Sequence, residues 1–115
     1  LYGEHQAHNA AVAIAAVESF LGDGTQRLAD DVVAEGLATV TSPGRLQLIG
    51  MEPSVLVDAA HNPHGAQALA RALLSSFAFD SITAIVGVLA DKDDRGIIEA
   101  LDPVVDRFVV SRSDS

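Results

Sequence analysis

The stretch VLVDAAHNPHG, residues 55–65, brings a carboxylate, a histidine and a helix start close together. Apolar residues lead directly into Asp58, His61 follows, and Asn62 with Pro63 is typical of a helix N-cap and first turn. A helix start attracts anions, a carboxylate can accept hydrogen bonds from ribose, and histidine titrates near neutral pH. The stretch predicts a nucleotide or phosphate site, although capping and loop closure explain the same spacing equally well.

Three further segments carry polar or charged residues, none of which indicates a particular function when taken singly. Arg45 follows the tight turn of Pro43 and Gly44 and could pair with phosphate through two donors, but a lone arginine there is more often simply exposed. Lys92 lies in the acidic segment ADKDD, for which a solvated turn with Asp93 capping the next helix is the simpler interpretation. The two histidines of HQAHN, residues 5–9, lack a third ligand at suitable spacing, so a structural metal is not expected.

Apolar periodicity predicts the elements that position these groups. We expect a hairpin over 45–57, helices over 63–77 and 94–101, and strands over 82–89 and 107–111. Strands that alternate with helices of this length indicate an α/β fold with a mostly parallel sheet, and the apolar run ITAIVGVL is typical of a strand covered on both faces. Ligands in such sheets bind beyond the carboxyl ends of strands, where DAAHNPHG and GVLADKDD fall.

The first part of the chain predicts two helices. Residues 6–21 are apolar on most sides, so this helix is expected to be buried, and GDG at 22–24 should end it. A second helix is predicted over 25–37, with Thr25 as its N-cap.

Composition narrows the possible functions. The chain has 115 residues, 49% of them apolar, which is enough for one domain with a real core. A net charge of −9 and only 4% aromatic residues argue against nucleic acid as a partner. The absence of cysteine excludes disulfides and thiolate chemistry and is consistent with the cytoplasm. No signal peptide or apolar run of membrane-spanning length occurs, so no membrane association is expected.

Four motifs, GEHQAHNAAVAIAAVE, SPGRLQ, DAAHNPHG and GVLADKD, occur in this order. Together they resemble the folylpolyglutamate synthase and dihydrofolate synthase family of Mur ligases. The resemblance implies a Rossmann-like C-terminal ligase domain, with flanking helices on a mostly parallel sheet, preceded by a helix from a central domain. It assigns residues 1–37 to the end of the central ATPase domain and a linker, and residues 38–115 to the C-terminal domain. The missing initiator Met and the abrupt end after a strand lead us to expect a truncated piece of a longer protein.

The resemblance also implies roles for individual residues. Asn9 matches the asparagine that contacts the adenine of ATP, Arg45 the arginine that reaches its phosphates, and Asp58 the aspartate at the ribose. His61 matches the catalytic histidine close to the terminal phosphate and the incoming amino acid. Lys92 is expected near the cleft, with a less defined role.

The implied reaction is ATP-dependent ligation of L-glutamate to dihydropteroate or a folate through an acyl phosphate, with Mg²⁺. The sequence contains no G-x-x-x-x-G-K-[ST] loop, so the main phosphate cradle, the metal ligands and most of the folate site are expected in the rest of the parent polypeptide. Ala59 replaces a glycine usual in the family, and Gln47 a common glutamate; both changes look tolerable. We therefore expect the isolated chain to be catalytically inactive.

Other functions stay open at this point. A peptidoglycan Mur ligase shares the chemistry, but PGRLQ with DAAHNPHG favours the folate branch. A non-catalytic α/β nucleotide-binding module has the same architecture, since fold does not determine activity. An NAD-dependent oxidoreductase is disfavoured because no G-x-G-x-x-G follows a strand. The ligase and the non-catalytic module can be distinguished by asking whether Asn9, Arg45, Asp58 and His61 converge on one cleft.

Overall fold

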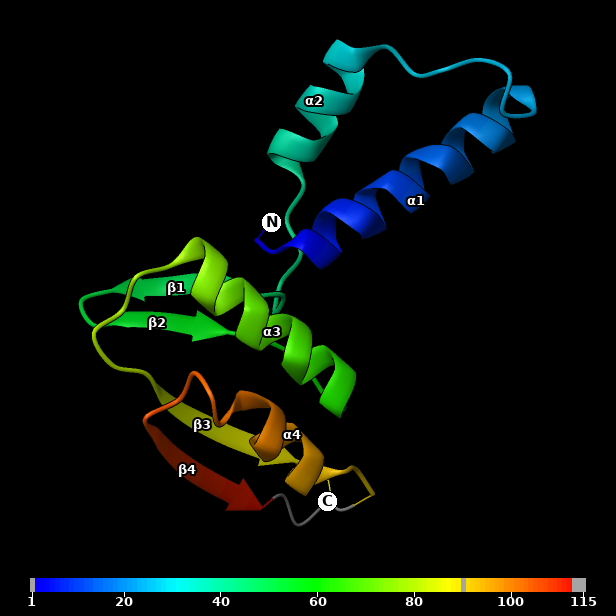
Figure 1. Cartoon of the computed structure of the whole chain (residues 1–115). Helices are drawn as coiled ribbons and strands as arrows, with labels where there is room; N and C mark the ends of the chain where they lie inside the picture. Colours follow the sequence, from blue (N-terminus) through cyan, green and yellow to red (C-terminus); the bar gives the residue numbers. More distant parts are fainter. Residues whose placement is uncertain (1, 90, 113–115) are drawn as a thin grey trace.

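A computed structural model describes residues 2–89 and 91–112, so Ala90 of GVLADKD and the last residues of VVSRSDS lie outside the described residues. The elements follow the predicted order (Figure 1). They are α1 (Glu4–Gly22), α2 (Asp30–Thr39), β1 (Gln47–Met51), β2 (Ser54–Val57), α3 (Pro63–Ser76), β3 (Thr83–Val88), α4 (Asp94–Leu101) and β4 (Arg107–Arg112). From residue 45 onward the predicted helices and strands are confirmed to within a few residues.

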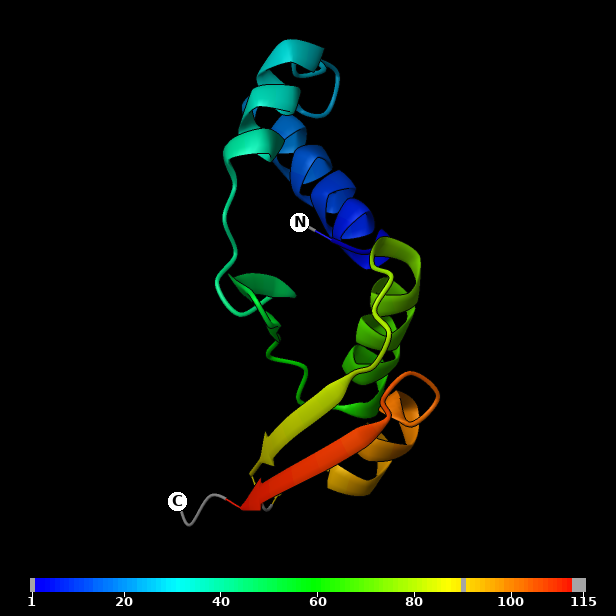
Figure 2. The same cartoon turned by 90° about the vertical axis from the view of Figure 1, so that its left-hand side faces the viewer.

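Helices α1 and α2 form an arm that projects from the remaining elements (Figures 1 and 2). The described chain is accordingly elongated, with principal extents of 49 × 33 × 24 Å. The arm meets the rest of the chain where the start of α1 reaches α3: the rings of Tyr2 and Phe77 lie 5.0 Å apart.

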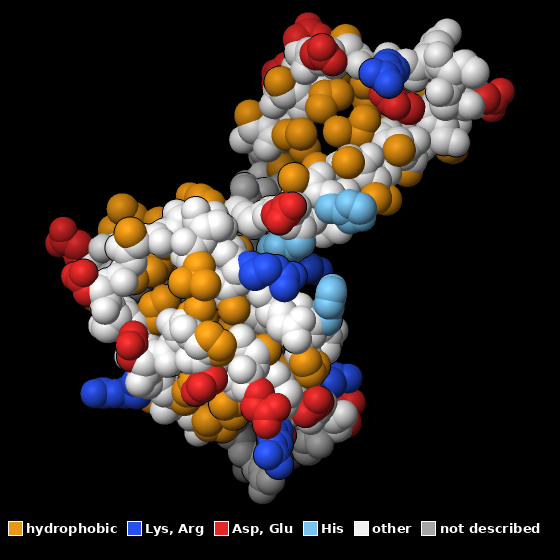
Figure 3. Space-filling model, viewed as in Figure 1, with side chains coloured by type: hydrophobic (Ala, Val, Ile, Leu, Met, Phe, Trp, Pro, Cys, Tyr) orange, Lys and Arg blue, Asp and Glu red, His pale blue; other side chains and the backbone are white. Residues whose placement is uncertain are grey.

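The prediction that the first helix is buried was wrong for the described residues. Gln6 is the residue of α1 that is buried, whereas Phe20 is 89% exposed and Leu21 68%. Apolar residues occur on most sides of the helix, and α2 diverges from α1 instead of covering it (Figure 1), so most of this surface is exposed; Figure 3 shows apolar side chains on the arm. Among the described residues, no helix is long and apolar enough to cross a bilayer.

The second helix begins at Asp30 rather than Thr25, which corrects the predicted N-cap. The Thr25 hydroxyl instead donates to the Gly22 carbonyl at 2.8 Å, so it stabilises the turn that ends α1. That turn places Asp23 in the left-handed conformation at φ 54°. Local hydrogen bonding of the threonine therefore prevails over its capping potential.

The strands form two small sheets. β1 and β2 make the predicted antiparallel hairpin, and β3 pairs with β4 in parallel, as expected for a βαβ unit. Asp106 secures the start of the parallel pair, since its carboxylate accepts the Ile82 N–H at 2.7 Å and its own N–H donates to the Ile82 carbonyl at 2.9 Å.

Helices α3 and α4 cover one face of the β3–β4 pair (Figure 2). Their buried residues pack against alternate strand residues and form the core; they are Ala66, Ala70, Ile97 and Leu101, against Val86, Val88 and Phe108. The opposite face is open in the part of the chain described, because Ile85 is 79% exposed and its register partner Val109 48%. The expectation of cover on both faces therefore holds for one face only.

Candidate functional site

Asp58 directly follows β2 and joins two loops. One carboxylate oxygen accepts the backbone N–H of Leu46 at 2.7 Å and the other accepts that of Ala60 at 2.8 Å. A carboxylate has about four acceptor positions, so a further donor such as a ribose hydroxyl can still be accommodated. The side chain therefore closes the hairpin, as one of the two interpretations of the sequence expected, and retains capacity for a ligand.

Arg45 lies on the turn that Asp58 holds. Gly44 adopts φ 71°, which favours glycine, and its carbonyl accepts the Ala59 N–H at 2.7 Å. The Gly44 N–H donates to Oε1 of Gln47 at 3.0 Å, so the side chain of Gln47 supports the turn. The Arg45 side chain is exposed and makes no ion pair within residues 2–89 and 91–112. Its guanidinium is free to pair with an anion.

His61 is exposed on the loop after β2, with Nδ1 3.1 Å from the Ala59 carbonyl oxygen. If Nδ1 donates to that carbonyl, the other ring nitrogen, Nε2, is left for a ligand or a proton. Ala59 therefore links both loops: its N–H binds Gly44 and its carbonyl orients His61. The hydrogen bonds of Asp58 and Ala59 thus join the segments that carry Arg45, Asp58 and His61.

The start of α3 follows this loop. Asn62 is the N-cap, and its side chain accepts the Gly65 N–H at 2.8 Å, while Pro63 occupies the first turn. The predicted cap is confirmed. The cap also leaves fewer free N–H groups for the anion that was expected at this helix start. The Gly65 N–H is bound to Asn62, the Ala66 N–H bonds to the Asn62 carbonyl, and proline has no N–H.

The loop of Lys92 lies beside the same helix start because Gly96 allows a close approach. A Cβ added at Gly96 would meet Cγ of Pro63 at 2.7 Å, so the first turn of α4 rests on the first turn of α3. Asp93 caps α4 by accepting the Gly96 N–H at 2.8 Å. Lys92 forms an ion pair with Asp91 at 3.0 Å, so the prediction of a solvated acidic turn describes it well.

Asn9 lies on α1 and is exposed, and no hydrogen bond among the described residues joins it to the loops of Arg45, Asp58 and His61. The described contacts join the start of α1 to α3: a Cβ added at Gly3 would meet Cβ of Ala72 at 2.9 Å. Hydrogen bonds therefore join the loops of Arg45, Asp58 and His61, Asn9 lies on α1, and the convergence of all four on one cleft stays a prediction.

A cleft of about 500 Å³ lies between α1 and α3, and its side chains include Glu4, His5, His8, Arg71 and Ser75. Figure 3 shows basic and histidine side chains gathered in the notch below the arm. Sequence reasoning missed Arg71, because one arginine on an amphipathic helix carries no distinctive signal. The described residues contain no group of three or more His, Cys, Asp or Glu that could hold a metal ion.

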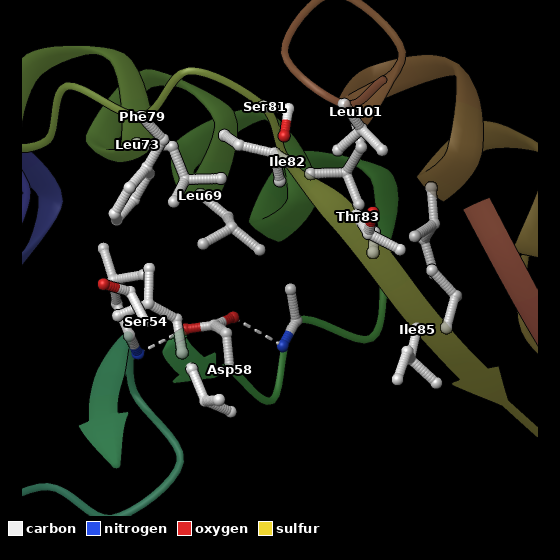
Figure 4. A pocket seen from close by; sticks show the side chains of 18 of the residues that line it. Ser54, Asp58, Leu69, Leu73, Phe79, Ser81, Ile82, Thr83, Ile85 and Leu101 are labelled. Atoms are coloured by element: carbon white, nitrogen blue, oxygen red, sulfur yellow. Dashed lines mark hydrogen bonds between the residues drawn. The ribbon is translucent and has the colours of Figure 1, made fainter. Parts of the chain in front are cut away.

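A second hollow, of about 630 Å³, lies between β2 and β3 (Figure 4). Its lining is largely apolar, and Asp58 and Ala60 border it at one end. The loops at that end carry a cation, a carboxylate and an imidazole, which can bind an anionic ligand that also bears hydroxyl groups.

The chain matches the family described as Mur ligase, glutamate ligase domain, over residues 44–115. It is 53% identical, over 116 aligned positions, to a dihydrofolate synthase/folylpolyglutamate synthase of Mycobacterium tuberculosis, covering 100% of this chain and 24% of that relative. It thus spans about a quarter of the relative's length.

Solved structures agree with this likeness. A Mycobacterium tuberculosis folylpolyglutamate synthase complexed with ADP and AMPPCP superposes with a TM-score of 0.88 at 50% identity, covering 100% of this chain and 25% of that one. A bifunctional folylpolyglutamate synthase/dihydrofolate synthase with Mn, AMPPNP and L-glutamate bound gives a TM-score of 0.64 at 31% identity, covering 74% and 21%.

Proposed function

Because the chain belongs to the Mur ligase family, through its glutamate ligase domain, we propose that it is part of an ATP-dependent ligase that joins L-glutamate to dihydropteroate, to folates, or to both. The observation that carries this proposal is the joining of the Arg45 and His61 loops through Asp58 and Ala59. In that arrangement one polyphosphate could contact groups from both loops.

In the proposed reaction a carboxylate oxygen of the folate-type substrate attacks the terminal phosphorus of ATP, and ADP leaves. The amine of L-glutamate then attacks the carbonyl carbon of the acyl phosphate, phosphate leaves, and an amide bond remains. Such catalysis depends chiefly on positioning and on neutralising phosphoryl charge. The present chain would supply groups on one side of the nucleotide, and the rest of the parent the phosphate loop and folate site.

We assign roles within this scheme by residue. Arg45 pairs with the phosphates, Asp58 accepts from the ribose while holding its two backbone N–H groups, and Asn9 contacts the adenine. His61 acts near the terminal phosphate and the incoming glutamate through Nε2. Lys92 stays at the edge of this site, since Asp91 pairs with it. The proposed domain division, residues 1–37 and 38–115, is supported by the family match from residue 44.

Mg²⁺ would neutralise phosphoryl charge in this reaction. The described residues do not fit it, because they include no suitable group of carboxylates and histidines. Its ligands are therefore assigned to the rest of the parent, and none of the residue roles above depends on the metal. A cytoplasmic location for the parent belongs to the same proposal and is consistent with a chain without cysteine.

The deciding experiment is ADP release by the intact parent polypeptide with L-glutamate and Mg-ATP, offering dihydropteroate and tetrahydrofolate separately. Turnover that requires L-glutamate and either pterin supports the ligase and shows which step it performs. A folded parent that binds ATP but releases no ADP with either substrate would favour a non-catalytic nucleotide-binding module, or a Mur ligase with another substrate.

The isolated 115-residue chain should release no ADP under the same conditions, because it contains no phosphate-binding loop. Measurable turnover by the purified chain would contradict this expectation.

A further inference from the structure

Gly3, at the start of the arm, lies against Ala72 of α3 (Figures 1 and 2). A Cβ added at Gly3 would lie 2.9 Å from Cβ of Ala72, which is closer than two carbon atoms can pack. Gly3 also has φ 95°, a backbone conformation that favours glycine. The neighbouring helix and the local backbone therefore each require a residue without a side chain here.

Ala72 connects this contact to the proposed nucleotide site. Its side chain is 2% exposed, and it belongs to the same buried cluster as Leu46. The backbone N–H of Leu46 is the group that the Asp58 carboxylate holds at 2.7 Å, and Leu46 directly follows Arg45. The arm therefore rests on the part of the core that carries the Arg45 loop.

The other side of the contact leads to Asn9. The Gln6 N–H donates to the Gly3 carbonyl at 3.0 Å, so α1 is hydrogen-bonded from Gly3 onward, and Gln6 is buried. Asn9 follows Gly3 by about 9 Å along the helix axis. Because a hydrogen-bonded helix moves as a unit over this length, a displacement at Gly3 also displaces Asn9.

We propose that the contact of Gly3 with Ala72 sets the distance between the arm and the loops that Asp58 holds. Asn9 at the adenine and Arg45 at the phosphates then reach the same nucleotide. The inference rests on the proposed function for these two assignments. Gly3 and Ala72 are positioning residues, since they act through the placement of α1 and not by touching the nucleotide.

The proposal predicts which ligands respond to a change at the contact. A methyl group at Gly3 must move α1 away from α3 by about 1 Å, because Cβ of Ala72 is fixed to its helix. A ligand that spans both sides of the site loses affinity, since misplacement of this size is costly. A ligand that occupies only the phosphate side does not.

The test compares ATP with inorganic tripolyphosphate, which has no adenine, by calorimetric titration of the parent polypeptide. Gly3→Ala should weaken ATP binding by about tenfold or more and tripolyphosphate binding by less than about twofold. Adding Ala72→Gly should restore most of the ratio between the two affinities, because it removes the methyl group that the new one meets. Equal loss for both ligands, loss for neither, or no restoration overturns the proposal.

Two controls separate the contact from backbone strain and from overpacking. Gly24→Ala places a side chain at φ 73° with no atom within 4 Å, so it adds strain alone. Ala72→Val enlarges the contact from α3 without a positive φ and replaces Gly3→Ala if that variant does not fold. Its control is Ala70→Val, a buried alanine of α3 that packs in the other core cluster. A ratio altered as strongly by either control overturns the proposal.

The wild-type parent distinguishes failure of this inference from failure of the ligase assignment. If it releases ADP in response to L-glutamate and the Gly3 and Ala72 variants keep its ratio, the positioning role is wrong and the ligase assignment stands. If it binds ATP without releasing ADP, the ligase reaction is rejected, while the affinity ratio still tests the contact.

Discussion

The carboxylate of Asp58 accepts a hydrogen bond of 2.7 Å from the backbone N–H of Leu46, twelve residues earlier in the chain. Leu46 has a positive φ of 43°, uncommon for a residue with a side chain, yet its side chain is only 2% exposed. The same bond therefore keeps Leu46 in the core and holds the neighbouring Arg45 at the end of the hairpin. The Asp58 carboxylate therefore has a structural role in the hairpin and a proposed role in ligand binding.

Replacing Asp58 with Asn should destabilise the protein as well as weaken nucleotide use. The amide group has one acceptor oxygen instead of two, so one of the N–H groups of Leu46 and Ala60 loses its partner, at a cost of about 1–3 kcal/mol. Thermal unfolding and ATP titration of the parent measure the two effects. Asp80→Asn is the matched control, because Asp80 is exposed and makes no described hydrogen bond. Weaker ATP binding with an unchanged midpoint would contradict the structural role of Asp58.

Leu46→Ala should lower the free energy of unfolding by about 2–5 kcal/mol, because it leaves a cavity against Ala72, Leu73 and Leu56. The control is Leu74→Ala on α3, where the side chain is 70% exposed and a change within about 0.5 kcal/mol is expected. Chemical denaturation of the parent measures both. Equal effects at the two leucines would place Leu46 outside the core.

Gly96→Ala should destabilise the packing of α3 and α4 by about 1–3 kcal/mol, since the added methyl group meets Pro63 and the Asp93 cap. Helix propensity alone predicts the opposite sign, a gain of up to about 1 kcal/mol. Gly36→Ala in α2 tests that alternative, because no atom lies within 4 Å of the added Cβ. Thermal midpoints of the two variants should move in opposite directions, and a shared increase would refute the close approach.

Arg45→Ala in the parent should chiefly weaken nucleotide use, by about 1.5–3 kcal/mol for a charged hydrogen bond. The dependence of ADP release on ATP concentration provides the measurement. Arg27→Ala removes another exposed arginine, from the loop between α1 and α2, and should leave that dependence unchanged. An unaltered ATP dependence in Arg45→Ala would remove Arg45 from the site.

His61→Ala should lower turnover more than ATP affinity, because the imidazole is assigned to the terminal phosphate and the incoming glutamate. Steady-state rates and an independent ATP titration separate the two quantities. His64→Ala, three residues further on the same exposed helix start, controls for loss of a nearby imidazole. A loss confined to ATP binding would contradict the assigned role.

Local signals explain why much of this molecule could be predicted. Asn62-Pro63 marks the start of α3, the apolar run ITAIVGVL marks β3, and both signals depend on neighbours in the chain. Local signals also gave two wrong predictions. Thr25 was expected to cap α2, but its hydroxyl donates to the nearby Gly22 carbonyl. The apolar helix α1 was expected to be buried, but it lies exposed in the described chain.

The sequence by itself determined the order of the elements, the caps of α3 and α4, and the motifs that place Asp58 and His61 after a strand, because these depend on short-range periodicity and backbone chemistry. Only the tertiary structure decided that Asp58 holds Leu46, that Gly96 lets α4 rest on Pro63, and that β2 and β3 stand apart with a groove between them. These relationships join residues distant in the chain, and their energies come from packing and hydrogen bonds that no local pattern encodes.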